Sequence, residues 1–479
     1  MRYLWYAIVV ALYGSSSLWA ADERMNVLFI VSDDLTNNTL SCYGSAVCQT
    51  PHLDKLASRG VRFDRAYCQF PLCNPSRASF LTGLRPDTLR VYENATQFRK
   101  NVPDAQSLGQ TFQKGGYQVV RVGKLYHYGV PAQIGTEGLD DKPSWNRTIN
   151  PRGRDKDDED AGLIFTLSPD AKGSARFGGT LSWLASDGID AEHTDGKIAA
   201  EVAKLLATKR DKPFFLACGF FRPHTPYVAP KKYFDLYPNE RLKLASIPVD
   251  HWKQHPTAAF GSYKKEQDKL TDTLRRQALQ AYYASTSFMD AQVGVVLAEL
   301  ERQKLAERTI VVFISDHGYH LGEHGLWQKM SLFENSARVP LIIYDPRAKG
   351  NGKSSRRTVE LVDLHATLAD LAGLTAPKTD GTSLRPLLEN PDATWDRPAY
   401  TQVSRGTPTA TGDKVGKSPW FMGRSIRNER YRYTEWDGGK KGMQLYDYDK
   451  DPGELKNLAD DATYAEVVKE MKARLATKR

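Results

Sequence analysis

The fold of this chain is constrained most by a pattern that the sequence contains twice. Residues 26–34 and residues 309–318 each form an apolar run that ends in Asp-Asp or Asp-His-Gly. Such a run is typical of a strand that is buried on both faces, as in a parallel sheet. Three shorter runs of the same kind lie at 119–123, 213–220 and 339–344. We predict that all of these segments are strands of one sheet.

Helical patterns separate these strands. The clearest one covers residues 271–304, where large apolar side chains recur at helical spacing. An alternation of buried strands and helices is the pattern of an α/β fold. We therefore predict a large, mostly parallel central sheet that is flanked by helices.

The acidic residues at two strand ends form a candidate metal site. In open α/β sheets, sites form beyond the carboxyl ends of the strands, so we expect Asp33, Asp34, Asp316 and His317 to converge. Neighbouring carboxylates repel each other when they are buried unpaired, and a divalent cation would explain their placement. Oxygen-rich ligands favour Ca²⁺ or Mg²⁺ over Zn²⁺. Taken alone, each acidic pair would also fit a solvated turn.

The C-terminal part of the chain has a different character. From about residue 377, strands are predicted at 424–427, 429–436 and 443–448, and a closing helix at 464–475. A chain of 479 residues is long enough for one large domain and a smaller one. We predict a catalytic domain over 21–376 and an α+β subdomain with an antiparallel sheet over 377–479. Residues 407–417 are expected to form a loop.

The N-terminus has the features of a signal peptide over residues 1–20. Arg2 precedes an apolar stretch that is too short to span a bilayer comfortably, and small residues follow it. An uncleaved anchor is the alternative. Export to the periplasm, the outside or a lysosomal-type compartment is expected, with no membrane span after cleavage. Export permits disulfides, and Cys42 and Cys48 fit either a disulfide or two buried thiols.

The charge balance argues against nucleic acid as a partner. Lys and Arg number 66 and Asp and Glu 57, a formal net charge of +9, but no basic block occurs. The densest charge run, residues 152–160, mixes both signs. The basic excess is compatible with an anionic substrate and equally with plain solubility.

One cysteine lies in an unusual setting. Pro75 suits the first turn of a helix, Ser76 can cap it, and residues 77–81 read as helix. Cys73 is then expected at a helix N-terminus, where free N–H groups attract anions. A buried structural thiol is the ordinary alternative for a cysteine. However, the whole pattern C-x-P-S-R-x-x-x-L-T-G is present, and it resembles the signature of the type I sulfatases.

Further motifs resemble one branch of that family, the iduronate-2-sulfatases. They are Gly-Lys-x-x-His at 123–127, Arg-Pro-His-x-Pro-Tyr at 222–227 and the segment 318–329, which contains Leu-Gly-Glu-His-Gly-Leu-Trp-Gln-Lys. The resemblance extends from about residue 26 to residue 458. It implies an alkaline-phosphatase-like sandwich and an enzyme that hydrolyses sulfate esters.

The resemblance also implies a cofactor and a set of site residues. Cys73 would be oxidised after translation to formylglycine, and Ca²⁺, ahead of Mg²⁺, would be the metal. The implied metal ligands are Asp33, Asp34, residue 73, Asp316 and His317. The implied catalytic residues are Cys73, Arg77, Lys124, His127, His224 and Lys329.

The implied cycle assigns each of these residues a task. The basic side chains neutralise the sulfate and hold the aldehyde hydrate, with Arg77 helping to activate one hydroxyl. His224 protonates the leaving alcohol, and His127 later removes the proton that allows sulfate to be expelled. His320 and His324 are assigned either to the substrate pocket or to a structural role.

The expected substrate is a sulfated uronic-acid glycan or oligosaccharide, carrying 2-O-sulfate as in the iduronate-2-sulfatase branch. A formylglycine-generating maturation enzyme is the expected protein partner. A phosphomonoester or phosphonate hydrolase of the same superfamily is one alternative. A non-catalytic glycan-binding relative is another, although every motif position that can be matched is intact.

Overall fold

The computed structural model describes residues 24–172, 176–406 and 420–478. Within these residues a nine-stranded sheet has the order β10-β2-β11-β9-β1-β7-β3-β4, and β12 also pairs with β2. The strands are β1 Asn26–Ser32, β2 Val61–Tyr67, β3 Gln118–Gly123, β4 Arg147–Ile149, β7 Phe214–Gly219, β9 Thr309–Ser315, β10 Arg338–Val339, β11 Leu341–Tyr344 and β12 Ser354–Glu360. The predicted signal peptide and the loop at 407–417 lie outside the described residues.

The register of the central strands decides where the site forms. β1 is parallel to β9 on one side, with Ser32 opposite Ser315, and parallel to β7 on the other. β3 is parallel to β7, with Gly123 opposite Gly219. The carboxyl ends of these four strands therefore meet at one edge of the sheet. This confirms the predicted, mostly parallel sheet.

The prediction of one continuous strand at 339–344 is wrong in detail. Pro340 has no N–H for the ladder and lies between two short strands, β10 and β11. Both pair antiparallel with β2, and β11 is also antiparallel to β9. The sheet is thus mixed on this side.

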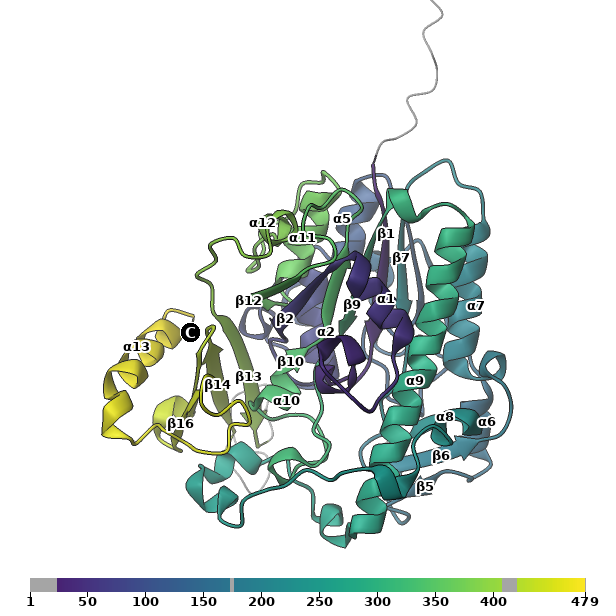
Figure 1. Cartoon of the computed structure of the whole chain (residues 1–479). Helices are drawn as coiled ribbons and strands as arrows, with labels where there is room; N and C mark the ends of the chain where they lie inside the picture. Colours follow the sequence, from purple (N-terminus) through teal and green to yellow (C-terminus); the bar gives the residue numbers. More distant parts are fainter. Residues whose placement is uncertain (1–23, 173–175, 407–419, 479) are drawn as a thin grey trace, which may run out of the picture.

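Two helical layers cover the sheet (Figure 1). Along β1, Val27, Phe29 and Val31 enter one core, whereas Leu28 and Ile30 enter the other. The second core is closed by α1 Pro51–Arg59, α7 Thr194–Ala207 and the long α9 Asp272–Arg302, which matches the predicted helix. The first core is closed by α2 Cys73–Thr82, α5 Leu108–Lys114, α11 Asp363–Leu371 and α12 Arg385–Glu389.

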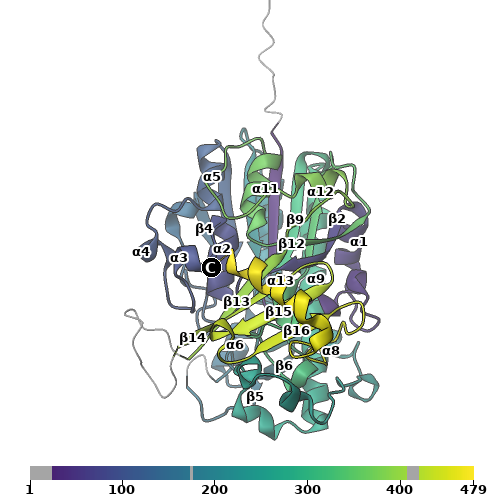
Figure 2. The same cartoon turned by 90° about the vertical axis from the view of Figure 1, so that its left-hand side faces the viewer.

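A separate antiparallel sheet occupies the C-terminal part (Figure 2). It has the order β13-β14-β15-β16, from Ala399–Arg405, Phe421–Arg427, Tyr431–Trp436 and Met443–Asp447. The helix α13, Ala465–Ala476, packs on one face of it through Met471 and Leu475. The predicted antiparallel sheet is confirmed, although β13 was not predicted and Glu429 lies in a turn. The domain division at residue 377 stays a prediction.

A small three-stranded sheet was also not predicted. It joins β5 Phe165–Thr166, β6 Ser182–Ser186 and β8 Tyr227–Pro230. Just before β5, the charged run contains α6, Arg154–Asp160, which buries Asp155, Lys156 and Asp158. Part of this mixed-charge run is therefore buried.

Two further expectations concern single features. Cys42 and Cys48 are both free thiols, so the disulfide alternative is not formed. Among the described residues, none of the helices combines the length and the apolar character that a bilayer crossing requires.

Candidate active site

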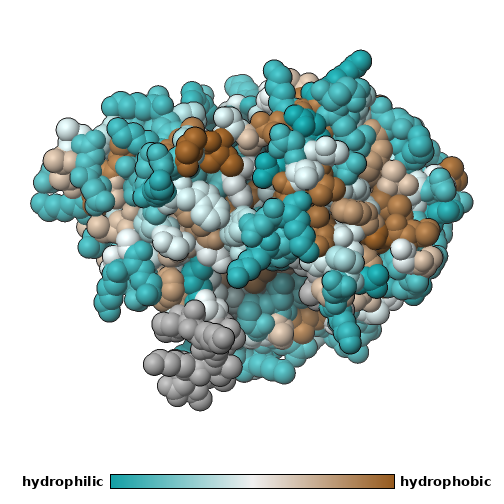
Figure 3. All heavy atoms as spheres, turned by 90° about the horizontal axis from the view of Figure 1, so that it is seen from below, coloured by the Kyte–Doolittle hydropathy of each residue, from teal (hydrophilic) through white to brown (hydrophobic). Residues whose placement is uncertain are grey.

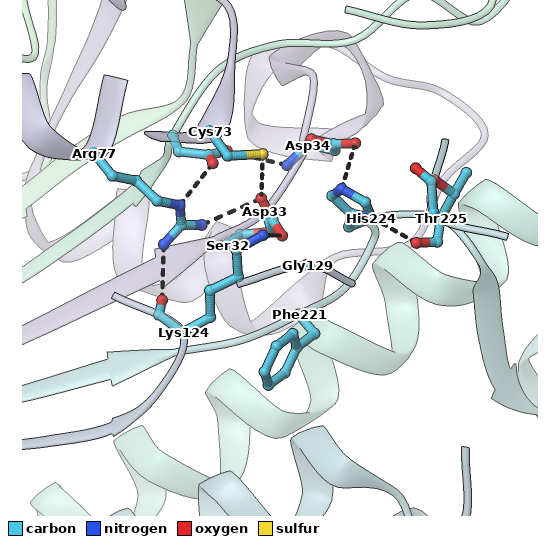
Figure 4. Close-up of polar contacts among 12 residues, drawn as sticks. Ser32, Asp33, Asp34, Cys73, Arg77, Lys124, Gly129, Phe221, His224 and Thr225 are labelled. Atoms are coloured by element: carbon cyan, nitrogen blue, oxygen red, sulfur yellow. Dashed lines mark hydrogen bonds and ion pairs between the residues drawn. The ribbon is translucent and has the colours of Figure 1, made fainter. Parts of the chain in front are cut away.

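The structure brings the predicted site residues together at the carboxyl edge of the central sheet. The acidic residues follow β1 and β9, Lys124 and His127 follow β3, and His224 lies in the loop between β7 and β8. The helix α2 points its N-terminus at this edge and supplies Cys73 and Arg77, while Lys329 lies in the segment between β9 and β10. Figure 4 shows several of these side chains turned toward one another.

The helix α2 differs from its prediction at the N-terminus. It begins at Cys73, and Leu72 is the N-cap residue without a side-chain capping bond. The Ser76 hydroxyl donates to the backbone carbonyl of Asp316 instead of capping. Ser76 thus ties the helix to the end of β9, and the capping role predicted for it is wrong.

Candidate metal ligands form a tight, buried cluster. Ligand atoms of Asp33, Cys73, Asp316 and His317 lie within 4.8 Å of one another. The His317 ring donates from Nδ1 to the Gly318 carbonyl at 3.0 Å, so its Nε2 faces the carboxylates. This arrangement fixes the tautomer that a metal ligand needs. The two carboxylates and one imidazole of the cluster, with the Asp34 carboxylate 3.2 Å from His317 Nε2, suit a hard divalent cation.

Asp34 shows two further signs of a functional position. Its φ angle is 63°, in the left-handed region that residues other than glycine seldom adopt. The Tyr282 hydroxyl donates to its carbonyl at 2.6 Å and thereby helps to hold it there. Its Oδ2 atom is buried without a hydrogen-bond partner in the described structure and lies 3.7 Å from Nε2 of His224. An unpaired buried carboxylate oxygen is costly, which fits an atom that is aimed at a ligand.

Arg77 braces the cluster from within the protein. Its Nε donates to Asp316 Oδ2 at 2.8 Å, and its Nη2 donates to Asp33 Oδ1 at 3.2 Å. Its Nη1 donates to the carbonyls of Lys124 and Leu125. Because these contacts occupy most of its donors, the geometry places Arg77 behind the carboxylates.

Two lysines face the thiol. Lys329 Nζ lies 3.2 Å from Cys73 Sγ and donates to Asp34 Oδ1 at 2.6 Å, while Lys124 Nζ donates to Asp33. Burial alone would raise the pKa of Cys73, but Lys124, Lys329 and His317 hold it well below its ordinary value. The side chain at position 73 is thus in a strongly electropositive setting that favours an anion.

The two predicted acid–base histidines border the cluster from the solvent side. The Nδ1 atom of His224 lies 2.5 Å from the Thr225 carbonyl, which leaves Nε2 facing Asp34. His127 has a buried Nδ1 without a partner among the described residues. Burial lowers the pKa of His127, although the neighbouring Cys73 acts in the opposite direction.

A buried ion pair positions the loop that carries His224. The carboxylate of Asp195 accepts the backbone N–H groups of Phe221 and Arg222, and Arg222 donates to Asp155 at 2.5 Å. The sequence analysis missed this support because Asp155 lies in a run that looks solvated. No local signal indicates that the pair forms.

A cavity of about 430 Å³ opens onto the cluster. Asp34, His127, His224 and Lys329 line its inner end. Its remaining wall includes residues to which the sequence analysis assigned no role. Among them are Asn94, Tyr128, Thr180, Lys264, Gln267, Trp327 and Gln328.

His320 and His324 do not line this cavity. They belong with His251 and His255 to a buried group that we call the histidine cluster. His251 Nε2 and His324 Nδ1 share a hydrogen bond at 2.9 Å, and the His324 ring stacks on Phe333 at 3.8 Å. The structure therefore favours the structural alternative for both residues.

Comparisons with known proteins agree with this geometry. The Sulfatase family profile matches residues 25–374, and a second one, N-sulphoglucosamine sulphohydrolase, C-terminal, matches residues 322–479. Iduronate 2-sulfatase of Mus musculus is 31% identical, over 95% of this chain and 94% of that protein. Choline-sulfatase of Rhizobium meliloti is also 31% identical, over 91% of this chain and 83% of that protein.

The fold has a close counterpart among solved structures. Phosphonate monoester hydrolase of Agrobacterium radiobacter superposes with a TM-score of 0.75 at 25% identity and covers 95% of each chain. The family profile alone spans most of the described sheet and both strand ends that carry the acidic residues. The chain therefore belongs to the sulfatase family, with the alkaline-phosphatase-like fold of that group.

Proposed function

We propose that this sulfuric ester hydrolase is an exported enzyme that removes sulfate from carbohydrates, using a divalent cation and a formylglycine at position 73. One observation carries the proposal. The Cys73 side chain lies 3.6 Å from Asp33 Oδ1, 3.4 Å from His317 Nε2 and 3.2 Å from Lys329 Nζ. A thiol placed among metal-type ligands and a lysine is a poor structural residue and a suitable precursor for a catalytic group.

The residues present fit a hard cation. Asp33, Asp34, Asp316 and His317 would hold it, and the orphaned Oδ2 of Asp34 supports that assignment. A bound Ca²⁺ would polarise a sulfate oxygen and neutralise part of its charge. Arg77 contributes by fixing Asp33 and Asp316 in place.

The contacts of the residue 73 side chain with Asp33, His317 and Lys329 support an oxygen nucleophile at this position. A hydrated aldehyde there would supply the attacking oxygen and a second hydroxyl to release the product. Lys124 and Lys329 stabilise negative charge at this position, since both approach the carboxylates around residue 73. The electropositive setting of Cys73 supports the same reading.

Two histidines are suited to proton transfer. His224 presents Nε2 to the cavity and is proposed to protonate the leaving alcohol. His127 borders the other side of the cavity and is proposed to accept the proton that accompanies sulfate release. The burial that lowers the pKa of His127 keeps the ring neutral, as a base requires.

The proposed substrate is a 2-O-sulfated uronic acid within a glycan. The name of the iduronate 2-sulfatase relative supports it, since the match spans 95% of this chain. The surface at the end of the molecule toward which β1 runs is mostly hydrophilic, with scattered apolar patches (Figure 3), and this suits a sugar chain. A formylglycine-generating enzyme is the proposed maturation partner, and the predicted signal peptide supports export.

A phosphonate or phosphomonoester hydrolase is the second candidate. The fold match with phosphonate monoester hydrolase of Agrobacterium radiobacter supports it, because a protein of that name has the same fold. Both reactions need stabilisation of a compact anion, so the cluster alone does not separate them.

The test compares matched esters on one protein preparation. We expect turnover of a nitrophenyl sulfate and a sulfated uronic-acid disaccharide, and much slower turnover of a nitrophenyl phosphate and a phenyl phosphonate. Intact-protein mass spectrometry should show the exchange of sulfur for oxygen at position 73. Chelation should remove activity, and Ca²⁺ should restore it better than Zn²⁺. Preferred phosphonate turnover would reverse the ranking, and full activity with an unmodified thiol would refute the nucleophile.

A further inference from the structure

We propose that Lys264 is a specificity residue that binds the carboxylate of the sulfated uronic acid. This inference rests on the proposed function, since it concerns the same cavity. Lys264 lies in the wall of the 430 Å³ cavity that also contains Asp34, His224 and Lys329. It lies outside the motifs that identify the catalytic residues.

The charges around the cavity leave this lysine available. Among the described residues that line the cavity, Asp34 is the sole carboxylate, and Lys329 already donates to it. Lys264 forms no ion pair within the described part of the chain, and its Nζ donates to the carbonyl of Gly179. An ammonium group has three N–H donors, so two are left for a ligand.

Burial makes the unpaired ammonium group costly. It lowers the pKa of Lys264, and Lys329 in the same cavity acts in that direction, while Glu266 and Asp34 partly offset the effect. A bound anion would remove this penalty, because an opposite charge favours the ammonium form. The cavity therefore gains more from an anionic substituent near Lys264 than from a neutral one.

Two amide side chains on the same wall also lack partners. Gln267 is 5% exposed and its Oε1 accepts no hydrogen bond, while Nε2 of Gln328 donates none among the described residues. Both residues line the cavity. Buried polar atoms are normally paired, so unpaired ones that face a cavity indicate a polar ligand. Sugar hydroxyls can accept from Gln328 and donate to Gln267.

The segment that carries Lys264 is held firmly enough to recognise a substituent. The neighbouring Tyr263 packs edge-on against Trp252, with ring centroids 5.1 Å apart. Trp252 in turn stacks on Phe260 at 4.5 Å. A lysine anchored beside these rings loses less entropy when it binds an anion.

These observations assign two separate anion positions to one cavity. The sulfate reaches residue 73 at the end where Lys329 lies, and the carboxylate reaches Lys264 on the wall. A uronic acid carries both groups on one ring, whereas a neutral sugar sulfate carries only the first. The second position therefore discriminates between substrates without taking part in the chemistry.

The experiment measures selectivity on the full-length, matured enzyme. The two probes are a 2-O-sulfated uronic-acid disaccharide and the same compound with its carboxyl reduced to an alcohol. In Lys264→Met, the ratio of kcat/KM between acid and alcohol should fall about 10- to 100-fold, mainly through KM. Lys264→Arg should recover most of the ratio because it keeps the charge. Lys265→Met, the same change at an exposed neighbour, is the matched control and should leave the ratio as in the wild type.

Several outcomes would overturn the assignment. An equal loss on both probes would show that Lys264 only supports the Gly179 segment. An unchanged ratio would show that the carboxylate does not reach it. A loss confined to a disulfated neutral sugar would assign the position to a second sulfate instead. Failure of the wild type to hydrolyse any sulfate ester would instead refute the proposed function, and nitrophenyl sulfate turnover distinguishes the two failures.

Discussion

Two clusters of buried charge in this molecule look alike in composition and differ in completeness. The first is the active-site cluster around Cys73. The second, which we call the junction cluster, joins the large sheet to the C-terminal sheet and consists of Glu334, Arg427, Arg432, Tyr448 and Glu454.

In the junction cluster every carboxylate oxygen has a donor. The two oxygens of Glu334 accept from Tyr67, Tyr448 and Arg432. Those of Glu454 accept from Tyr448 at 2.5 Å and from the backbone N–H of Glu334 at 2.7 Å. Burial alone would raise the pKa of Glu334, but Arg432 and Arg427 hold it low. The carboxylate oxygens of this cluster are therefore all paired, although Arg427 Nε, 3.8 Å from Glu334 Oε2, makes no hydrogen bond in the described structure.

The active-site cluster differs in one respect. It leaves a carboxylate oxygen, Asp34 Oδ2, unpaired beside a cavity, whereas the carboxylate oxygens of Glu334, which also borders a cavity, are paired. Buried charges that are mutually satisfied stabilise an interface, whereas buried charges with an unfilled position prepare a site for a ligand. The comparison therefore separates structural from functional charge by whether every carboxylate oxygen has a donor.

The largest effect should come from Cys73→Ala. Turnover of every sulfate ester should fall by about 10⁴-fold or more, because the nucleophile is lost. The free energy of unfolding should change by only about 1 kcal/mol, since one small side chain is removed. Cys68→Ala is the matched control, because Cys68 is equally buried and lies outside the cluster. Similar activity losses in the two variants would place the defect in folding.

Glu334→Gln should have the opposite effect, a loss of stability with little loss of activity. Removing the charge of Glu334 leaves Arg427 without its carboxylate partner and Arg432 with Glu454 alone, so the free energy of unfolding should drop by about 3–5 kcal/mol. The kcat of the remaining folded enzyme should stay close to that of the wild type. Urea unfolding followed by tryptophan fluorescence measures the first quantity. Glu429→Gln removes a partly exposed partner of Arg357 and should cost less than about 1 kcal/mol. If the junction variant lost kcat instead, the two clusters would be coupled.

The histidine cluster is a third buried cluster of polar side chains, and its rings are uncharged. It predicts that the free energy of unfolding depends on pH. Burial lowers the pKa of His251 to about 4, of His320 to about 3 and of His324 well below its ordinary value. The folded state therefore binds fewer protons than the unfolded state below about pH 6.5. The stability that these rings contribute is complete above that pH and is lost as the pH falls toward 4.

The test uses a difference, because several buried carboxylates titrate in the opposite sense. In His324→Gln, unfolding free energy should fall less steeply between pH 6.5 and 4.5, by up to about 1.4 kcal/mol per pH unit. Urea midpoints measured at closely spaced pH values give the slopes. His52→Gln, at an exposed position, should change the slope less. Identical slopes in all three proteins would mean that the histidine cluster opens without protonation.

The smallest expected effect concerns Asp290, a buried carboxylate that is paired with backbone N–H groups and not with a cationic side chain. Asp290 on α9 accepts the N–H groups of His52 and Leu53 and so caps α1 from outside, where Thr50 makes no side-chain cap. Asp290→Ala should cost about 1–2 kcal/mol of unfolding free energy. Asp290→Asn should cost less, because burial raises the pKa of Asp290 to about 7 and a neutral acceptor is tolerated. Equal losses in thermal or urea unfolding would show that the charge itself caps the helix.

The parts of the fold that have a local sequence signal could be predicted. The buried strands and α9 follow from hydrophobic periodicity, and the acidic residues follow directly from strand ends. The candidate site residues could be named because they lie in compact motifs. The strand β13 and the sheet β5-β6-β8 were missed because they contain few large apolar residues and depend on tertiary pairing.

The remaining site residues have no local signal. In the sequence, nothing distinguishes Lys264 from an exposed lysine. Only the tertiary fold places it in the wall of the cavity. Asp155 resembles its acidic neighbours in α6, and only the pairing with Arg222 distinguishes it. The break at Pro340 was visible in the sequence, yet the direction of β11 was not, because direction is set by connection and packing.

The burial of Cys73 limits when the protein can be modified at this residue. In the folded chain its side chain is 0% exposed, and so are Ser76 and Arg77 of the same helix. An enzyme that oxidises this thiol cannot reach it once the sheet and α2 have assembled. The modification proposed here must therefore occur on the nascent or still unfolded polypeptide. On that proposal, a molecule that folds with its thiol intact stays inactive, and the yield of active enzyme depends on whether oxidation precedes folding during biosynthesis.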